Sequence, residues 1–491
     1  MKFRSSAAAS RPAFARAALA GAGAAVIFFS VLTLAIASTR PRYGGTLRVE
    51  LRERVTTLDP RVRPAEAQIA RAQEELDALV FDRLLRLDDQ GRVAPALAVT
   101  WQSDGGDKRW QFQLRPGVQF SDGTPLTAEI AAAALAPVVA SEFGSDARVS
   151  GAGELLTIES AESMPGLPQE MATGRNFIFR VAADGTLGGT GPFIPDHWNF
   201  NAQPAQATFA ANARCWAGRP FVDRVTVTLG VDSTRIEADL EFGLADAGEL
   251  APAEMRLAAE RGVRTWSSQP MDLFVLAFDS ERLAAQDALL REAIAAAIDR
   301  NAIANVVLQR QAIAAGALLP DWISGYAFLF PAGPPSAVKT GATAVRPTAP
   351  LVLVYDSQDA EARAVAERVV VDLRAAGVAA EAVAAGTQAA DARVARIPIA
   401  QPDPSAALAY VLAALARPGS PVASAAASDA DPESQYAAER AALADFRIVP
   451  LAHESENWGL GAALRDWMAP RWGDLRLADA WLDLPAAANT Q

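Results

Sequence analysis

The chain has 491 residues, of which 51% are hydrophobic and 21% charged, a balance typical of folded globular proteins rather than disordered ones. Its length exceeds the roughly 250 residues at which a single core stops growing, so we expect at least two lobes. A formal charge of -12 argues against a nucleic-acid partner. A lone cysteine, Cys215, excludes an intrachain disulfide, and with only two histidines, His197 and His453, we expect neither a metal site nor a resident cofactor.

The first 37 residues have the pattern of an export segment. Basic residues without any acid precede an uncharged apolar stretch, and Ala35-Ile36-Ala37 supplies a signal peptidase pattern before Ser38. The uncharged run 17–39 also exceeds the roughly 20 residues that span a bilayer, so an uncleaved membrane anchor is the alternative. Both interpretations place the rest of the chain outside the cytoplasm, in the periplasm or an equivalent compartment, and the uncleaved anchor would tether it to the inner membrane.

Strands and helices then alternate along the chain. Residues 44–51 alternate apolar and polar side chains, which predicts a strand with one buried face. Residues 65–85 change to a spacing of three or four, which predicts an amphipathic helix. Strict alternation returns at 109–115 and predicts another strand. Thr127 suits the N-cap of the helix that follows.

The second half of the chain continues this pattern. Residues 287–298 carry an apolar stripe that predicts a helix, and Asp299 suits the N-cap of the next helix, which we expect to run from 300 to 308. A strand at 351–355, a helix at 360–375 and a strand from 378 onward predict a βαβ-like unit. Interleaved strands and helices place the chain in the α/β or α+β class.

The most specific motif is LRPGVQFSDGTPLTAE at residues 114–129. Other motifs extend in a fixed order over nearly the whole chain after the export segment: GGTLRV at 44–49, LDP at 58–60, FDRLLRLDDQGRVAPALA at 81–98, Trp101, GTGPF at 189–193, NARCWAGRP at 212–220, REAI at 291–294, AIDR at 297–300, VPL at 449–451 and LADAWL at 477–482. Together these motifs resemble the family 5 extracellular solute-binding proteins of ABC importers, the group that includes oligopeptide- and dipeptide-binding proteins.

The resemblance implies an α/β, bilobed fold like that of periplasmic binding proteins, of type II and of the large kind with an extra subdomain. Two lobes are joined by crossing strands, and ligand sits between them. The family layout implies lobe 1 from 43–60, 185–268 and 446–491, the extra subdomain of lobe 1 from 61–184, and lobe 2 from 269–445.

The resemblance also implies a binding protein rather than an enzyme. Its ligand, a peptide or a similar small polar solute, would stabilise the closed arrangement of the lobes by touching both. Its partners would be the permease and ATPase subunits of an ABC importer, and we expect a monomer.

Candidate ligand contacts follow from the same resemblance. Family members that bind peptides use a carboxylate that pairs with the ligand's amino terminus, and Gln401-Pro402-Asp403-Pro404 is similar to the family's cleft segment, so Asp403 is a candidate. Capping a turn is the alternative role for Asp403. Thr57 and Asp59 lie in the first crossing toward the subdomain and are candidates for the cleft wall, although a turn before proline also explains Asp59.

The aromatic residues divide into two groups. Trp322 and Trp458 lie near loops that flank the cleft in this family, so both are candidate ligand contacts, with ordinary packing as the alternative. Core packing is expected of the tryptophans inside fold-defining motifs, Trp110, Trp216 and Trp481. His453 follows a predicted strand and is expected to be a structural histidine.

Two rival functions remain. The stretch 144–188 is compressed relative to the family and the segment after Phe330 lacks a helical portion, which leaves a membrane-tethered binding or sensor module without transport as an alternative. A secreted serine hydrolase is the other, because Ser336-Ala337-Val338-Lys339 overlaps Lys339-Thr340-Gly341. In such enzymes the two motifs lie on separate elements, whereas here they share one lysine in a connection rich in Pro and Gly, so the hydrolase is not favoured.

Overall fold

A computed structural model describes residues 40–64, 66–174, 176–278, 287–333, 349–386, 389–399, 401–416, 431–467 and 475–483. The export segment and the Ser336 to Gly341 motif lie outside these residues, so the predictions made for them stay predictions. All that follows concerns the unit Tyr43–Gln491.

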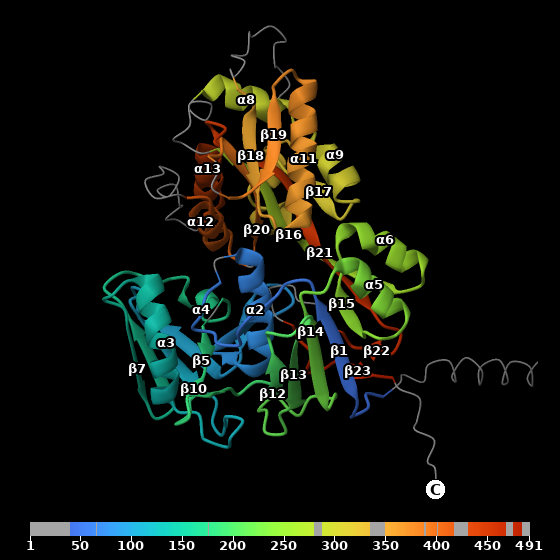
Figure 1. The fold of residues 1–491 in the computed structure, drawn as a ribbon. Coiled ribbons are helices and arrows are strands. Elements are labelled where there is room, and N and C mark those ends of the chain that lie inside the picture. Colours follow the sequence, from blue (N-terminus) through green and yellow to red (C-terminus); the bar gives the residue numbers. More distant parts are fainter. Residues whose placement is uncertain are drawn as a thin grey trace, which may run out of the picture. The chain divides into compact units, whose positions relative to one another are not determined.

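One large mixed sheet organises this unit (Figure 1). Its strand order is β12-β13-β14-β1-β15-β21-β16-β20-β18-β19, and β17 pairs with β21. The strands are β1 (Thr46–Leu51), β12 (Phe193–Asn199), β13 (Ala205–Ala211), β14 (Arg224–Leu229), β15 (Ala247–Glu249), β16 (Arg264–Phe278), β17 (Ala312–Ala314), β18 (Leu351–Tyr355), β19 (Ala380–Ala384), β20 (Ala392–Pro398) and β21 (Ile448–Leu460).

The strand expected at 44–51 is confirmed as β1, which pairs in parallel with β14 and β15. Its alternation places Leu47, Val49 and Leu51 in one hydrophobic core with β13 and β14. The helix α2 (Ala67–Val80) packs into the same core through Leu76 and Leu79, as the three-to-four spacing predicted.

The extra antiparallel sheet lies beside this core. Its order is β5 (Ala98–Ser103), β6 (Arg109–Leu114), β8 (Leu155–Glu159) and β7 (Arg148–Ala152), with a separate core under α3 (Ala128–Phe143). Thr127 caps α3 as expected, because its hydroxyl accepts a hydrogen bond from the Ile130 amide. Smaller elements nearby are β2 (Asp82–Arg83), β3 (Leu85–Leu87), β4 (Val93–Pro95), α4 (Leu167–Glu170), β9 (Phe177–Ile178), β10 (Arg180–Val181) and β11 (Leu187–Gly188).

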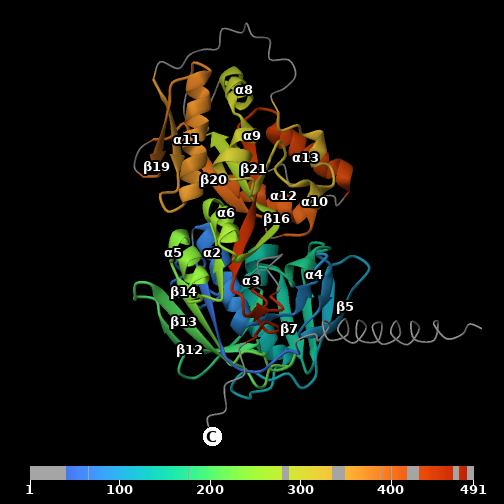
Figure 2. The same cartoon turned by 90° about the vertical axis from the view of Figure 1, so that its right-hand side faces the viewer.

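The expected βαβ unit is confirmed: α11 (Ala360–Ala375) connects the parallel strands β18 and β19. Helix α8 (Ala288–Ala297) and α11 pack into one hydrophobic core on one face of β16 and β20. Helices α12 (Pro404–Leu415) and α13 (Pro432–Leu443) cover the other face of these two strands (Figure 2). Alternation in β16 explains the two faces, since Phe274 and Leu276 join the core of α11 while Leu273 and Val275 join that of α12.

Two helices differ from their predictions. The helix expected at 65–85 ends at Val80, and Asp82–Arg83 already forms the strand β2. The helix expected at 300–308 is shorter. Asp299 caps α9 (Arg300–Ala302) by accepting a hydrogen bond from the Ala302 amide at 3.0 Å, but the chain continues as a π-helix, Ile303–Val307. The Leu308 amide donates to the Ile303 carbonyl, five residues earlier. This wider turn lets Ile303 and Leu308 both pack into the core.

The long strands β16 and β21 connect the two halves of the sheet (Figures 1 and 2). At one end β21 pairs with β15, and at the other β16 pairs with β20. They are the crossing strands that the sequence led us to expect. The remaining elements are α5 (Ser233–Glu241), α6 (Pro252–Glu260), α10 (Asp321–Ser324), a 3-10 helix (Ala327–Leu329), β22 (Leu464–Arg465) and β23 (Trp481–Leu482).

Candidate functional site

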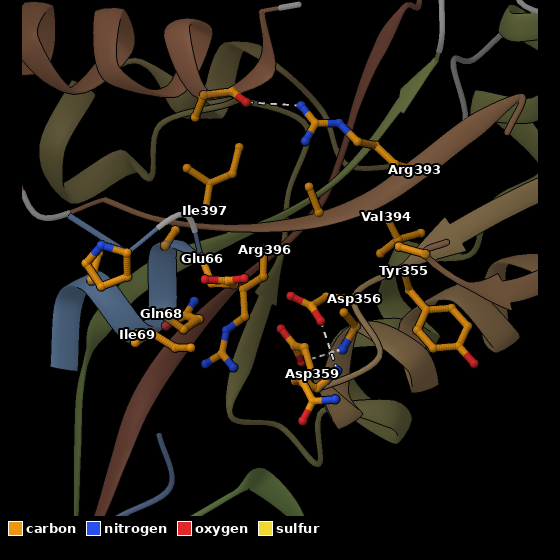
Figure 3. Close-up of a pocket in the computed structure, with 18 of the residues that line it drawn as sticks. Glu66, Gln68, Ile69, Tyr355, Asp356, Asp359, Arg393, Val394, Arg396 and Ile397 are labelled. Atoms are coloured by element: carbon orange, nitrogen blue, oxygen red, sulfur yellow. Dashed lines mark hydrogen bonds between the residues drawn. The ribbon is translucent and has the colours of Figure 1, made fainter. Parts of the chain in front are cut away.

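A cavity of about 930 Å³ lies between the start of α2 and the ends of β18 and β20. Figure 3 shows Glu66, Gln68 and Ile69 on one side, Tyr355, Asp356 and Asp359 on the other, and Arg396 between them. One wall comes from Glu53 and residues 63, 64 and 66–70, and the opposite wall from residues 354–359, β20 and α12.

The β18–α11 loop is held in place by its own carboxylates. Asp356 accepts a hydrogen bond from the Gln358 amide at 2.9 Å, and Asp359 caps α11 by accepting one from the Ala362 amide at 2.8 Å. The loop follows the carboxyl end of a strand in a parallel pair and leads into a helix, the position at which α/β sheets bind ligands. These contacts hold the loop in place without a solute.

The cavity wall carries groups of both charges and a phenol. Burial, with a contribution from Glu249, raises the pKa of Glu53 to about 7. Burial also raises the pKa of Tyr410, so its hydroxyl stays protonated near neutral pH. Arg63 and Arg393 line the same cavity. These groups can donate to and accept from a small polar solute of either charge.

A serine hydroxyl also belongs to the lining. Ser357 is the one serine among the described lining residues, and its hydroxyl accepts a hydrogen bond from the side-chain amide of Gln358 at 3.2 Å. The described lining residues include no histidine or cysteine. Their hydroxyl, carboxylate and guanidinium groups can bind a solute by hydrogen bonds and charge.

Behind this wall, a buried network of arginines and acids connects α2 and β20 to the crossing strands. Arg396 of β20 lies 2.8 Å from Asp272 of β16 and 2.8 Å from Glu454 of β21. From the other side, Arg71 of α2 lies 3.0 Å from Asp272 and also pairs with Glu456 of β21. The Asp272 carboxylate thus pairs with two guanidinium groups, one on α2 and one on β20, and these two elements pack in different cores.

In this network the pKa values of the arginines and of two of the acids are all raised. Burial opposes the charge of Arg396, but Glu454 and Asp272 outweigh it and raise its pKa. Burial raises the pKa of Glu454 to about 8 and that of Glu456 to about 7, in spite of the nearby arginines. Near neutral pH, Glu454 and Glu456 are therefore protonated in a fraction of the molecules.

The sequence analysis did not single out this network. A signal was present, because Asp272 interrupts the otherwise apolar run MDLFVLAF and Glu454 and Glu456 interrupt a strand that is buried along its whole length. Charged residues are rarely buried unless they are paired, so such interruptions indicate partners elsewhere in the chain.

The five predicted contacts lie elsewhere; none of them lines this cavity. The Thr57 hydroxyl accepts a hydrogen bond from the Asp59 amide at 3.1 Å. The Asp59 carboxylate accepts hydrogen bonds from the amide and guanidinium of Arg61, and that side-chain bond lowers its pKa. Both residues thus have roles within a local turn.

The other three also have local partners. Asp403 caps α12 by accepting from the Ala406 amide at 2.9 Å, and Trp322 donates to the Pro270 carbonyl at 2.9 Å. Trp458 is fully buried, donates to Glu456 and packs on Trp467 with ring centroids 5.0 Å apart. Contact with ligand stays a prediction for all five candidates.

The expectations for the other aromatic residues fit the structure. Trp110 and Trp481 are buried and Trp216 is partly buried, and each ring nitrogen donates a hydrogen bond, to Met164, Asp466 and Asp82 respectively. His453 is buried, with a hydrogen bond to Leu318. It is the structural histidine that we expected.

The described ranges contain no group of three or more His, Cys, Asp or Glu residues placed to hold a metal ion. None of the helices in these ranges combines the length and the apolar character needed to cross a membrane.

Comparisons with known proteins were made for the sequence and for the fold. The family model "Bacterial extracellular solute-binding proteins, family 5 Middle" matches residues 92–160 and 179–431, more than half of the chain. The nickel-binding periplasmic protein of Escherichia coli (strain K12) is 27% identical over 253 residues, which are 46% of this chain and 47% of that protein. The probable D,D-dipeptide-binding periplasmic protein DdpA of the same organism is 22% identical, over 47% of this chain and 48% of that protein. The chain thus spans about half the length of these curated relatives.

Solved structures match over nearly their whole length. NikA from Brucella suis in complex with Fe(III)-EDTA matches with a TM-score of 0.75 at 18% identity, and the match covers 89% of this chain and 100% of the NikA chain. The oligopeptide-binding protein AppA from Bacillus subtilis, in complex with a nonapeptide, has a TM-score of 0.69 at 16% identity, over 90% and 100%. These similarities confirm the expected α/β, bilobed fold of type II.

Proposed function

Because the chain belongs to the family 5 bacterial extracellular solute-binding proteins, we propose that it binds a small polar solute outside the cytoplasm and delivers it to an ABC importer. The observation that carries this proposal is the cavity of about 930 Å³, whose walls come from α2 on one side and from β18, β20 and α12 on the other. A solute held there touches both halves of the large sheet. It therefore favours the arrangement in which the halves are closed.

The solute that we propose is a peptide or a similar small polar molecule. Glu53 and Asp359 offer carboxylates to an ammonium group, and Arg63 and Arg393 offer guanidinium groups to a carboxylate. A molecule with both kinds of group satisfies more of the wall than a simple ion does. The relatives differ in this respect, since one is named for nickel and another for a D,D-dipeptide.

The remaining parts of the proposal follow from the family. The chain works as a monomer without covalent chemistry, with lobe 1, the extra subdomain and lobe 2 bounded as the sequence analysis expects. It docks on a permease whose ATPase supplies the energy. The N-terminal segment is removed before Ser38; an intact N-terminus on the exported protein, seen by mass spectrometry, would favour the tethered module instead.

A ligand screen tests the binding function directly. The exported chain is mixed with a panel of di- to nonapeptides, amino acids and nickel chelates, and thermal unfolding is recorded. A ligand at 100 times its Kd stabilises the folded state by about 3 kcal/mol, and scattering then shows compaction. Unchanged unfolding across the panel, together with unchanged scattering, contradicts the proposal.

A matched pair of variants ties any binding to the cavity. Ala413 of α12 lines the cavity and is exposed, so Ala413→Trp fills space there without disturbing a core. Ala441 of α13 is also exposed but is not part of the lining, so Ala441→Trp is the control. We expect Ala413→Trp to abolish ligand-induced stabilisation and Ala441→Trp to keep it.

A further inference from the structure

Arg52 and Glu361 form an ion pair between the two halves of the large sheet. The Nη2 atom of Arg52 lies 2.7 Å and 2.8 Å from the two carboxylate oxygens of Glu361. The side chains are only 18% and 9% exposed. Burial opposes the charge of Arg52, but Glu361 and Glu249 outweigh it and raise its pKa. The pair is thus charged and largely withdrawn from water.

The two residues belong to different cores. Arg52 directly follows β1, whose apolar residues pack with β13 and β14. Glu361 lies in the first turn of α11, whose apolar residues pack with β18 and β20. In the sheet, β15, β21, β16 and β20 stand between β1 and β18. Arg52 and Glu361 therefore join segments that lie on opposite sides of the crossing strands β16 and β21.

Asp272 supplies a second junction of the same kind. It lies on the crossing strand β16, where Arg71 approaches from α2 and Arg396 from β20. Arg396 also lies 3.8 Å from Glu361, so the two junctions are continuous. All five side chains belong to the protein itself, and their attraction needs no solute.

We infer that the Arg52–Glu361 pair, with Arg71 and Arg396 on Asp272, is an ionic latch that favours the closed arrangement in the absence of ligand. The inference builds on the proposed function, which supplies the opening and closing of the two halves. Removing one partner of a buried ion pair leaves the other charge without water or counter-charge. That cost arises only while the halves are together, because opening returns the remaining charge to water.

The latch has a consequence for binding. Apparent affinity is reduced by the fraction of molecules in the binding-competent form, so a chain that closes on its own loses less affinity to that equilibrium. The Arg52–Glu361 pair sets this fraction and so tunes affinity from outside the cavity wall, since neither residue lines the cavity, whereas Arg396 does. Breaking it weakens binding without removing a ligand contact.

A double-mutant cycle on the ligand-free exported chain tests the latch. The radius of gyration from small-angle scattering is compared for wild type, Arg52→Met, Glu361→Met and the double variant. We expect both single variants to expand, because each removes the attraction between Arg52 and Glu361. The double variant should expand no further than the single variants, because the first substitution already removes the interaction that the two residues share.

Two controls keep the outcome clear. Glu367, on the same helix, pairs with Arg363 within α11 and at the surface, so Glu367→Met should keep the wild-type radius. Glu361→Gln provides a milder break should a methionine variant fail to fold. Single variants as compact as wild type, or a double variant whose expansion is the sum of those of the singles, overturn the latch. No ligand is used, so a negative ligand screen leaves this result interpretable.

Discussion

The Nε2 atom of His453 donates a hydrogen bond of 3.0 Å to the backbone carbonyl of Leu318. The ring lies in β21 and is buried, and burial lowers its pKa to about 4. The histidine is therefore neutral near pH 7. This contact links β21 to the segment that leads into α10.

His453 makes stability sensitive to acid. Its pKa is lower in the folded state than the ordinary 6.5, so its contribution to stability is present above pH 6.5 and is lost as pH falls toward 4. Between pH 7 and pH 5 this loss amounts to about 2 kcal/mol. We expect His453→Gln to lose less stability than wild type over this range in urea titrations. The exposed His197 provides the control variant His197→Gln, and equal acid sensitivity in all three proteins contradicts the prediction.

Asp272→Asn tests the buried network. The substitution keeps the shape of the side chain but removes the negative charge between Arg71 and Arg396, whose other acid partners compensate only in part. We expect the free energy of unfolding to fall by roughly 3 kcal/mol. Glu260→Gln breaks a pair whose side chains are 80% and 56% exposed, and should change stability by less than about 1 kcal/mol. Equal effects of the two variants in chemical denaturation would argue against a network held by charge.

Gly189→Ala tests the close approach of the GTGPF motif to α2. A Cβ atom at this position would stand 1.9 Å from the carbonyl oxygen of Val80, at the end of α2, so the backbone must shift to admit it. We expect a loss of about 2 kcal/mol or more, measured by thermal or urea unfolding. At Gly105 a Cβ atom meets nothing within 4 Å, and Gly105→Ala should be nearly neutral.

Asp403 variants separate the two roles considered for this residue. Asp403→Ala removes the cap of α12 and should cost about 1 kcal/mol of stability, whereas Asp403→Asn keeps a capping oxygen and should cost little. Once a ligand is found, isothermal titration of Asp403→Asn decides between cap and contact. Unchanged affinity assigns the residue to the cap alone, and a tenfold loss or more assigns its charge to the ligand.

Local structure was predictable because it depends on residues that are close together in the sequence. The helix expected at 360–375 has the observed bounds, and Thr127 and Asp299 cap the helices that they were expected to cap. Side-chain alternation, apolar spacing and capping oxygens act within a few residues of one another, so they can be read without the fold. The π-helix after Ala302 escaped prediction, because the core position of Leu308 decides it.

The sequence by itself determined the strands, helices, caps and family motifs, and with them the bilobed fold. Only the tertiary structure decided which charges meet. Arg52 and Glu361 stand 309 positions apart, Arg71 and Asp272 201 apart, and Asp272 and Arg396 124 apart. The attraction between charges depends on their distance and on their burial. Residues so far apart in the sequence become close and buried only once β16 and β21 have brought the two cores together.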